Sequence, residues 1–152
     1  MKNLNVNRYA IFEYEILDKY TAGIVLTGEE IKAARGGLLN LKDAFGVVSA
    51  GEISLLNCYI GRYKNSFATS SNIDERRSRK LLLTKREIRH LIGDISQKGL
   101  TLIPLKAFIN DKGFLKIELG VAKHKKMYDK RKEIRERDIN REARRDLKRF
   151  GL

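Results

Sequence analysis

The chain has 152 residues, of which 42% are hydrophobic, and a formal net charge of +13 at pH 7. This length suits one domain with a modest core, and the basic balance indicates RNA, DNA or an acidic membrane surface as the partner. No apolar run approaches the length of a membrane-spanning helix, and residues 1–8 lack the apolar segment of a secretory signal. We therefore expect neither a membrane-spanning helix nor a secretory signal.

The first third of the chain reads as two strands followed by a helix. Residues 10–17 and 20–26 have strand patterns, with a tight turn expected at Asp18-Lys19. Thr27 and Glu30 form a capping box, which predicts a helix that begins after Thr27. This helix should end at Gly36-Gly37, because glycine suits a left-handed C-terminus.

The remainder of the body reads as two hairpins around a second helix. Residues 44–49 and 52–60 predict a hairpin about Ala50-Gly51, and the polar segment 62–79 predicts a long mobile loop. Thr84 and Glu87 form a second capping box, for a helix that Gly99 ends. Residues 100–109 and 114–122 predict the last hairpin, and Pro104 implies an edge position or a bulge in its first strand.

Six short strands with hairpin connections indicate a mainly β fold. We expect a small closed six-stranded β-barrel with two or three short helices, since closure removes exposed strand edges. The expected organisation is a barrel domain over 1–122 and a basic C-terminal tail over 123–152. The tail holds thirteen Lys or Arg and six Asp or Glu, too little apolar surface to offset its ordering entropy, so we expect disorder in the free protein.

The tail nevertheless carries one helical stripe. Ile139, Ala143, Leu147 and Phe150 are spaced by four, four and three residues, which places them on one face of a helix. A basic segment that becomes a helix on contact with something acidic points to a nucleic-acid surface. The tail lacks the bulky apolar face that membrane-surface helices use, so no membrane partner is expected.

The sequence carries weak signals for catalysis or metal binding. His90 and His124 have no second ligand at metal spacing, no hydrolase or phosphate-loop motif is present, and no cofactor is expected. The single cysteine, Cys58, favours a reducing cytoplasmic compartment. Asp74-Glu75 could form a nuclease-like magnesium site, but a solvated charged loop is the better interpretation because two carboxylates do not define such a site.

Several basic and aromatic residues are candidates for RNA contact. Lys32 and Arg35 lie three residues apart on the first helix and could meet phosphates or bases, or form a solvated face. The cluster at 76–80, which includes Arg79 and Lys80, could contact phosphates or serve solubility. Tyr9, Tyr20 and Tyr63 could stack on bases, although a half-buried structural role is the better interpretation for each alone.

Six ordered motifs resemble the SmpB (small protein B) family, and the resemblance extends from Asn7 into the tail. They are AGIVLTGEEIK with Arg35 and Gly36, NLKD at 40–43, RSRKLLL at 77–83, KGLTLIPL at 98–105, GVAKHKK at 120–126 and YDKR at 128–131. The resemblance implies an oligonucleotide-binding-like barrel and a non-enzymatic adaptor. Such an adaptor binds the tRNA-like domain of transfer-messenger RNA (tmRNA) and delivers it to stalled ribosomes for trans-translation. Its tail then occupies the decoding centre and the empty mRNA channel as a helix.

The resemblance also implies partners and site residues. Small-subunit rRNA and elongation factor Tu with alanyl-tmRNA are the further expected partners, and a monomer is expected. The residues expected to bind tmRNA are Asn7, Lys32, Arg35, Arg79, Lys80, Leu82, Lys123, Lys125 and Lys126. Those expected at the decoding centre are Tyr128, which should stack on a base, and Asp129, Lys130 and Arg131.

Two departures from the family pattern bear on these expectations. Thr21 stands where some members carry a Glu implicated in tmRNA binding, and Glu75 replaces a frequent proline. A structural ribosomal protein with a basic extension is the alternative that composition alone allows. A ribonuclease that uses Asp74 and Glu75 is the second alternative.

Overall fold

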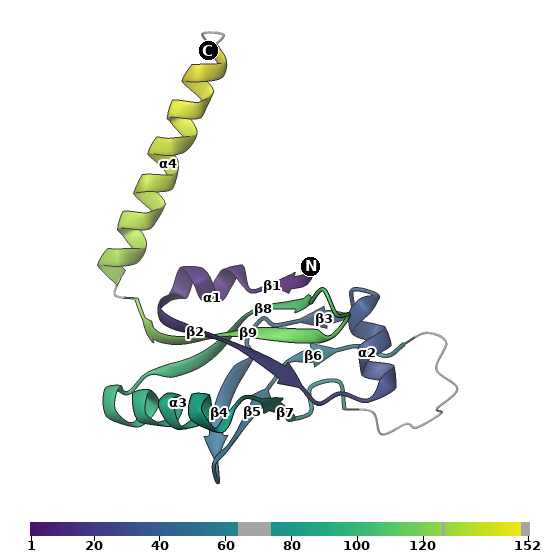
Figure 1. Cartoon of the computed structure of the whole chain (residues 1–152). Helices are drawn as coiled ribbons and strands as arrows, with labels where there is room; N and C mark the ends of the chain where they lie inside the picture. The colour runs from purple at the N-terminus through teal and green to yellow at the C-terminus, as the bar shows by residue number, and fades with distance from the viewer. Residues whose placement is uncertain (64–73, 126, 150–152) are drawn as a thin grey trace.

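The computed structural model describes residues 1–63, 74–125 and 127–149 of the chain (Figure 1). Within those ranges the helices and strands follow one another in this order: β1 (Lys2–Val6), α1 (Arg8–Glu13), β2 (Tyr14–Ile24), α2 (Gly28–Arg35), β3 (Leu39–Asn40), β4 (Phe45–Ser49), β5 (Glu52–Leu56), β6 (Tyr59–Ile60), β7 (Arg79–Leu82), α3 (Lys85–Lys98), β8 (Thr101–Ile109), β9 (Leu115–His124) and α4 (Met127–Arg149).

Six of the strands pair into a ring. The order is β8-β4-β5-β7-β2-β9, β9 pairs back to β8, and β1 pairs with residues 106–109 of β8. All of these pairings are antiparallel. The prediction of a mainly β fold is therefore confirmed.

The ring is unevenly joined. The β2–β9 ladder runs from Tyr14 opposite His124 to Gly23 opposite Lys116, whereas the β4–β8 contact is the single pair Gly46 and Leu102. A Cβ atom added at Gly46 would lie 2.5 Å from the Leu102 Cδ2 atom, closer than side chains tolerate. Glycine at position 46 therefore permits the close approach of β4 and β8.

The predicted strand at 10–17 is wrong in its first part, which is the helix α1. Asn7 caps this helix, since its Oδ1 accepts a hydrogen bond from the Ala10 N–H at 3.3 Å, and Ala10 is buried. The turn predicted at Asp18-Lys19 is also wrong. Both residues pair with β9, and a register shift between Ile16 and Asp18 marks a bulge in one continuous strand.

The hairpin about Ala50-Gly51 is confirmed, and both turn residues have positive φ values, 51° and 76°. Its second strand ends at Leu56 rather than at residue 60, because Asn57 adopts a left-handed conformation with φ 61°. Residues Tyr59–Ile60 then pair with β3 in a separate two-stranded sheet.

A strand that the sequence did not predict begins at the last residue of the loop predicted over 62–79. Residues Arg79–Leu82 form β7, which pairs with β5 on one side and β2 on the other. Residues 64–73 of this segment lie outside the described residues. The ring therefore has six strands, as predicted, but they are not the predicted six. The two strands predicted at 10–17 and 20–26 correspond to the single strand β2, and β7 is the sixth strand of the ring.

Both capping boxes are confirmed. Thr27 and Glu30 begin α2, and Thr84 and Glu87 begin α3, each with both reciprocal hydrogen bonds. Gly99 ends α3 in the left-handed region with φ 62°. The bulge expected from Pro104 is present as a register shift between Pro104 and Lys106.

The basic tail forms a long helix, α4, which projects away from the strand ring (Figure 1). The described residues thus form four helices, one of them long, where two or three short ones were predicted. The segment has no Pro or Gly before Gly151, and Asp138, Glu142 and Asp146 each precede an Arg by three residues, a spacing that favours a helix. Disorder of the tail in the free protein stays a prediction. No helix in the described part of the chain is long and apolar enough to cross a membrane.

Candidate RNA-binding surface

The C-terminal half of α2 presents the first pair of basic candidates. The Lys32 Nζ atom lies 5.6 Å from the centroid of the Tyr63 ring, within cation–π range. Both residues line an open groove of about 530 Å³ that also includes Arg62 and Arg77. The exposed Arg35 donates a hydrogen bond to the Gly113 carbonyl at 2.9 Å, which holds its guanidinium beside the β8–β9 turn.

The strand β7 adds the second group through its alternation. Arg79 and Leu81 are buried, whereas Lys80 and Leu82 are exposed, as the two-residue period of a strand requires. Lys80 pairs with Glu52 at 3.1 Å on the outside of the ring. Leu82 is 50% exposed and lies over Gly23 of β2, so it offers a bare apolar contact beside the basic groups.

Arg79 itself is placed inside the protein. Its side chain has no solvent exposure, its guanidinium pairs with Glu30 at 2.6 Å, and it donates to the carbonyls of Cys58 and Glu75. A guanidinium with these partners is satisfied within the fold. We therefore leave Arg79 out of the candidate surface and assign it to the core, contrary to the sequence expectation.

Glu30 is the centre of this buried network. Besides capping α2, it accepts hydrogen bonds from Arg77 and from the Nε of Arg79. Burial by itself raises the pKa of this carboxyl, but the hydrogen bonds from Arg77, from the Thr27 N–H and from Arg79 outweigh it and lower the pKa below its ordinary value. The carboxylate is thus charged at neutral pH and fixes α2 against β7.

Asn7 is likewise a structural residue in this geometry. Its side chain is buried, 5% exposed, and its amide donates hydrogen bonds to the carbonyls of Leu41 and Pro104. With the cap on α1, all the side-chain groups of Asn7 are engaged. A direct contact of this side chain with RNA would first require these bonds to break.

The basic residues at the end of β9 lie at the other end of the molecule. Lys123 pairs with Glu15 at 3.5 Å, and Lys125 is nearly covered, with 11% of its side chain exposed. Lys123 lies seven positions along β9 from Lys116, which is opposite Gly23. At the rise of a β-strand this is roughly 23 Å. The candidates on the body therefore form two groups. Lys126 lies outside the described residues.

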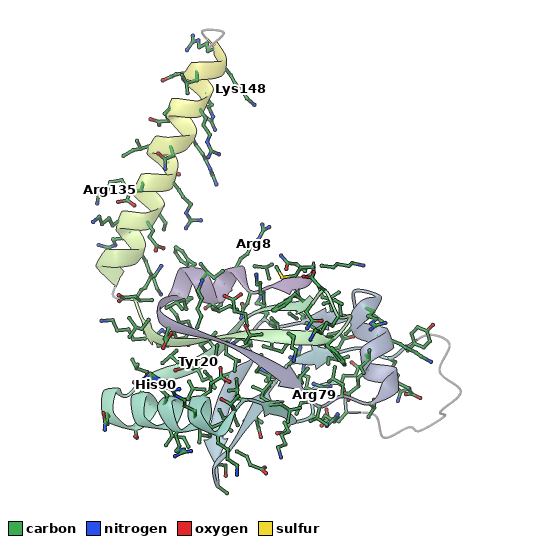
Figure 2. The ribbon with its side chains drawn as sticks, in the orientation of Figure 1. Arg8, Tyr20, Arg79, His90, Arg135 and Lys148 are labelled. Atoms are coloured by element: carbon green, nitrogen blue, oxygen red, sulfur yellow. The ribbon has the colours of Figure 1, made fainter. Side chains whose placement is uncertain are left out.

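The tail helix carries the third set of candidates. Arg131 is exposed and Lys130 is paired with Glu13 of α1. Ile139 and Leu147 are 58% and 50% exposed and Ala143 is exposed too, so the three described residues of the predicted stripe are uncovered. Figure 2 shows Arg135 and Lys148 on α4, away from the strand ring. The side chains of Tyr128 and Asp129, and the whole of Phe150, lie outside the described residues.

The three candidate tyrosines for base stacking differ in how exposed their rings are. Tyr9 is 55% exposed, whereas Tyr63 and Tyr20 pack partly against the core. The hydroxyl of Tyr20 lies 2.7 Å from the Nδ1 atom of His90, and the two side chains point toward one another in Figure 2. Of the three rings, that of Tyr9 is the most open to a base.

A group of possible metal ligands, which sequence spacing did not indicate, lies beside this contact. Ligand atoms of Asp18, His90 and Asp94 lie within 4.8 Å of one another. The His90 nitrogen that faces Asp94 is also the nitrogen bonded to Tyr20. We therefore interpret the group as a hydrogen-bonded link between β2 and α3.

The Asp74 carboxylate accepts a hydrogen bond from the Arg76 N–H at 3.0 Å and helps to shape the turn before β7.

A mainly β body with basic groups at two ends and a long basic helix defines a class of protein built to meet a polyanion. The family model described as "SmpB protein" matches residues 4–149. The chain therefore belongs to the SmpB family.

Individual relatives agree over almost the full length. The "SsrA-binding protein" of Coprothermobacter proteolyticus is 51% identical over 148 residues, which span 97% of this chain and 98% of the relative. The protein of the same description from Thermosipho africanus is 46% identical over 98% of this chain and 99% of its own. A solved structure described as "tmRNA-SmpB: a journey to the center of the bacterial ribosome" is 46% identical, with a TM-score of 0.65. That similarity covers 80% of this chain and 84% of the other.

Proposed function

We propose that this chain is an RNA-binding adaptor without enzymatic activity. It binds tmRNA through the tRNA-like domain and delivers it to stalled ribosomes for trans-translation. The observation that carries the proposal is the match to the SmpB family over residues 4–149, with relatives described as SsrA-binding proteins. The same match favours the adaptor over a structural ribosomal protein or a ribonuclease.

The tmRNA surface in this proposal is the α2–β7 end of the body. Lys32 and Arg35 supply charge for phosphates, and exposed Leu82 supplies an apolar contact beside Lys80. A folded RNA is recognised by shape, stacking and phosphate contacts, which a rigid surface of this kind serves. Thr21 of β2 offers no carboxylate, so this surface lacks the Glu that the resemblance implicates in tmRNA binding in some family members.

The second surface in this proposal serves the ribosome. Lys123, Lys125 and Lys126, which we assign to tmRNA, precede the tail helix. Within the tail, Tyr128 stacks on a decoding-centre base, and Asp129, Lys130 and Arg131 contact the decoding centre from the start of the helix. The stripe of Ile139, Ala143, Leu147 and Phe150 becomes buried when α4 enters the empty mRNA channel. Exposure of Ile139 and Leu147 in the free chain supports this part, because an unpaired apolar stripe gains stability from a partner surface.

The body in this proposal is a closed barrel of the oligonucleotide-binding type, over residues 1–122, with 123–152 as a separate tail. The ring of strand pairings supports closure. We further propose that the protein is a cytoplasmic monomer that works together with elongation factor Tu carrying alanyl-tmRNA, and that small-subunit rRNA is the tail's partner.

One experiment tests the core of this proposal. The full chain is isolated from its own cells and the RNA that co-purifies with it is sequenced, followed by a binding comparison between tmRNA and an unrelated RNA of equal length at matched salt. We expect tmRNA to be enriched and to bind more tightly, because non-specific binding depends mostly on charge. Equal affinity for the two RNAs would overturn the proposal.

A further inference from the structure

The outer face of three neighbouring strands carries a row of side chains across the body. The strands β2, β9 and β8 lie side by side in that order, with β9 in the middle (Figure 1). Thr21 of β2 is the register partner of Glu118 of β9, and Glu118 is also the partner of Lys106 of β8. Because residues directly opposite one another project to the same face of a sheet, these three side chains form one row.

The row faces away from the core. Ile117 and Leu119, the neighbours of Glu118 along β9, are fully buried, so the two-residue period of the strand directs Glu118 outward. Further along the same face, Ala122 belongs to a small buried cluster with Ala10 of α1, and this end of the face is covered. The open part of the face therefore begins near Glu118, whose side chain is 18% exposed.

Glu118 holds one lysine from each neighbouring strand. The Nζ atom of Lys19 lies 3.6 Å from the Glu118 Oε1 atom, and the Nζ atom of Lys106 lies 3.3 Å from Oε2. The Lys106 ammonium also lies 5.4 Å from the centroid of the Phe108 ring. Each carboxylate oxygen thus has an ammonium of its own, and the charges alternate between positive, negative and positive across the three strands.

This row adjoins the surface proposed for tmRNA. Gly23 of β2 is the register partner of both Leu82 of β7 and Lys116 of β9. A Cβ atom added at Gly23 would lie 3.3 Å from the Leu82 Cβ atom and 3.6 Å from the Lys116 Nζ atom. The β2 backbone is therefore bare between an exposed leucine and an ammonium. An RNA strand bound at Leu82 can continue across Gly23 to Glu118, two residues from Lys116 on the same face.

The alternation of ammonium, carboxylate and ammonium matches the chemistry of an RNA backbone. Lysine ammonium groups bind phosphates, whereas a carboxylate repels a phosphate and accepts a hydrogen bond from a hydroxyl. Between consecutive phosphates an RNA strand carries a ribose 2′-hydroxyl, which a DNA strand lacks. Ion pairs at a surface contribute little net stability, so an exchange of partners between this row and RNA costs little free energy.

From this match we propose that Glu118 is a specificity-determining residue that accepts a hydrogen bond from a ribose 2′-hydroxyl. Lys19 and Lys106 contact the phosphates on either side of that ribose. The inference rests on the proposed function, since the bound strand belongs to tmRNA and the row extends the surface at Leu82. The carboxylate also repels a strand that presents a phosphate at its position, so the row favours RNA over DNA.

Replacement of single 2′-hydroxyl groups in the RNA tests the contact. Transcripts of the tRNA-like domain of tmRNA carry 2′-deoxynucleotides at random positions, and the effect on binding by the full chain is mapped at each position. We expect at least one position where the 2′-deoxy change weakens binding by the parent about tenfold, as for a hydrogen bond to a charged group. With Glu118→Met that position should lose its effect, whereas the other positions should keep theirs.

Three further variants separate the hydroxyl contact from charge and from damage to the fold. Glu118→Gln keeps an acceptor oxygen without the charge, and should retain part of the effect at that position. Lys106→Met should weaken binding of every transcript alike, because a phosphate contact does not depend on the 2′-hydroxyl. Glu52→Met removes a carboxylate from the exposed pair with Lys80 and should give the map of the parent. The midpoint of urea unfolding of each variant should stay near that of the parent.

Identical 2′-deoxy maps for the parent and Glu118→Met would overturn the proposal. A position that depends on Glu118 and responds to inosine in place of guanosine, but not to the 2′-deoxy change, would also overturn it, because the carboxylate would then accept from a base amine. Equal affinity of the parent for tmRNA and for an unrelated RNA would defeat the proposed function. The 2′-deoxy map of the unrelated RNA would in that case still test Glu118.

Discussion

Arg79 and Glu30 are 49 residues apart in the sequence, and the Nε of Arg79 donates a hydrogen bond to Glu30 Oε2 at 2.6 Å in the interior. Arg77 donates to the same carboxylate from the rim. This relationship joins α2, which carries Lys32 and Arg35, to β7, which carries Lys80 and Leu82. The network thereby sets the mutual position of the residues proposed to bind tmRNA.

Replacement of Glu30 by Gln should destabilise the protein by about 3 kcal/mol at pH 7, because it leaves the buried Arg79 guanidinium without its counter-charge. The folded-state pKa of Glu30 is lowered, so its stabilising contribution is complete above the ordinary value of 4.5 and is lost as the pH falls through the lower folded value. The difference between parent and variant should therefore shrink in acid. Urea unfolding followed by the tyrosine near-ultraviolet circular dichroism signal measures this difference.

The matched control for Glu30 is Glu52→Gln. Glu52 makes an exposed pair with Lys80, so its loss should change the free energy of unfolding by less than about 1 kcal/mol at any pH. Equal effects of the two variants at pH 7 would contradict a buried network centred on Glu30.

Closure of the strand ring has its own test at Gly46. An added Cβ would lie 2.5 Å from Leu102 Cδ2 and 2.7 Å from Leu102 Cγ. Gly46→Ala should therefore cost about 1–3 kcal/mol in stability and increase amide hydrogen exchange along β4 and β8. Gly93→Ala is the control, since its added Cβ would meet no side chain or other segment of the protein within 4 Å and alanine favours the α3 helix. A Gly46→Ala protein as stable as the parent would mean that β4 and β8 need no close approach.

Alanine at both Lys32 and Arg35 should weaken tmRNA binding. If both side chains neutralise phosphates, the slope of log K against log salt should fall by roughly 0.9 for each residue in duplex regions. Lys85→Ala removes a lysine on exposed α3, outside the proposed surface, and should have a smaller effect. Filter binding over a range of salt concentrations gives both the affinity and the slope.

Removal of residues 128–152 should leave tmRNA binding nearly intact and abolish peptide tagging on stalled ribosomes. The body carries the proposed tmRNA surface, whereas the tail carries the groups proposed for the decoding centre and the channel. A loss of tmRNA affinity as large as that of the Lys32 and Arg35 variant would argue against this division of labour.

The exposed stripe on α4 can be probed without truncation. Ile139→Asp places a charge in the stripe, and should abolish tagging while leaving tmRNA affinity and body stability unchanged. Asn140→Asp adds the same charge one residue further on, about 100° around the helix, and should retain more tagging activity. Equal tagging by the two variants would mean that the stripe meets no apolar partner on the ribosome.

The sequence determined the features that depend on neighbours within a few residues. The capping boxes at Thr27 and Thr84, the stop at Gly99 and the Ala50-Gly51 turn all follow from local backbone chemistry. The ordered motifs and the basic tail likewise identified the family, because they are properties of the chain itself.

Only the tertiary structure decided which polar residues face solvent. Arg79 stands in a run of basic residues that reads as a surface cluster, yet Glu30 and three backbone carbonyls draw its guanidinium into the core. The Asn7 side chain is likewise held in the interior, by hydrogen bonds to the carbonyls of Leu41 and Pro104, which are 34 and 97 residues away. The strand β7, the close approach of β4 and β8 at Gly46 and the ion pair between Lys130 and Glu13 also arise from contacts between distant segments. Local sequence preferences do not predict such contacts, because the contacts form and contribute to stability only when the chain has folded.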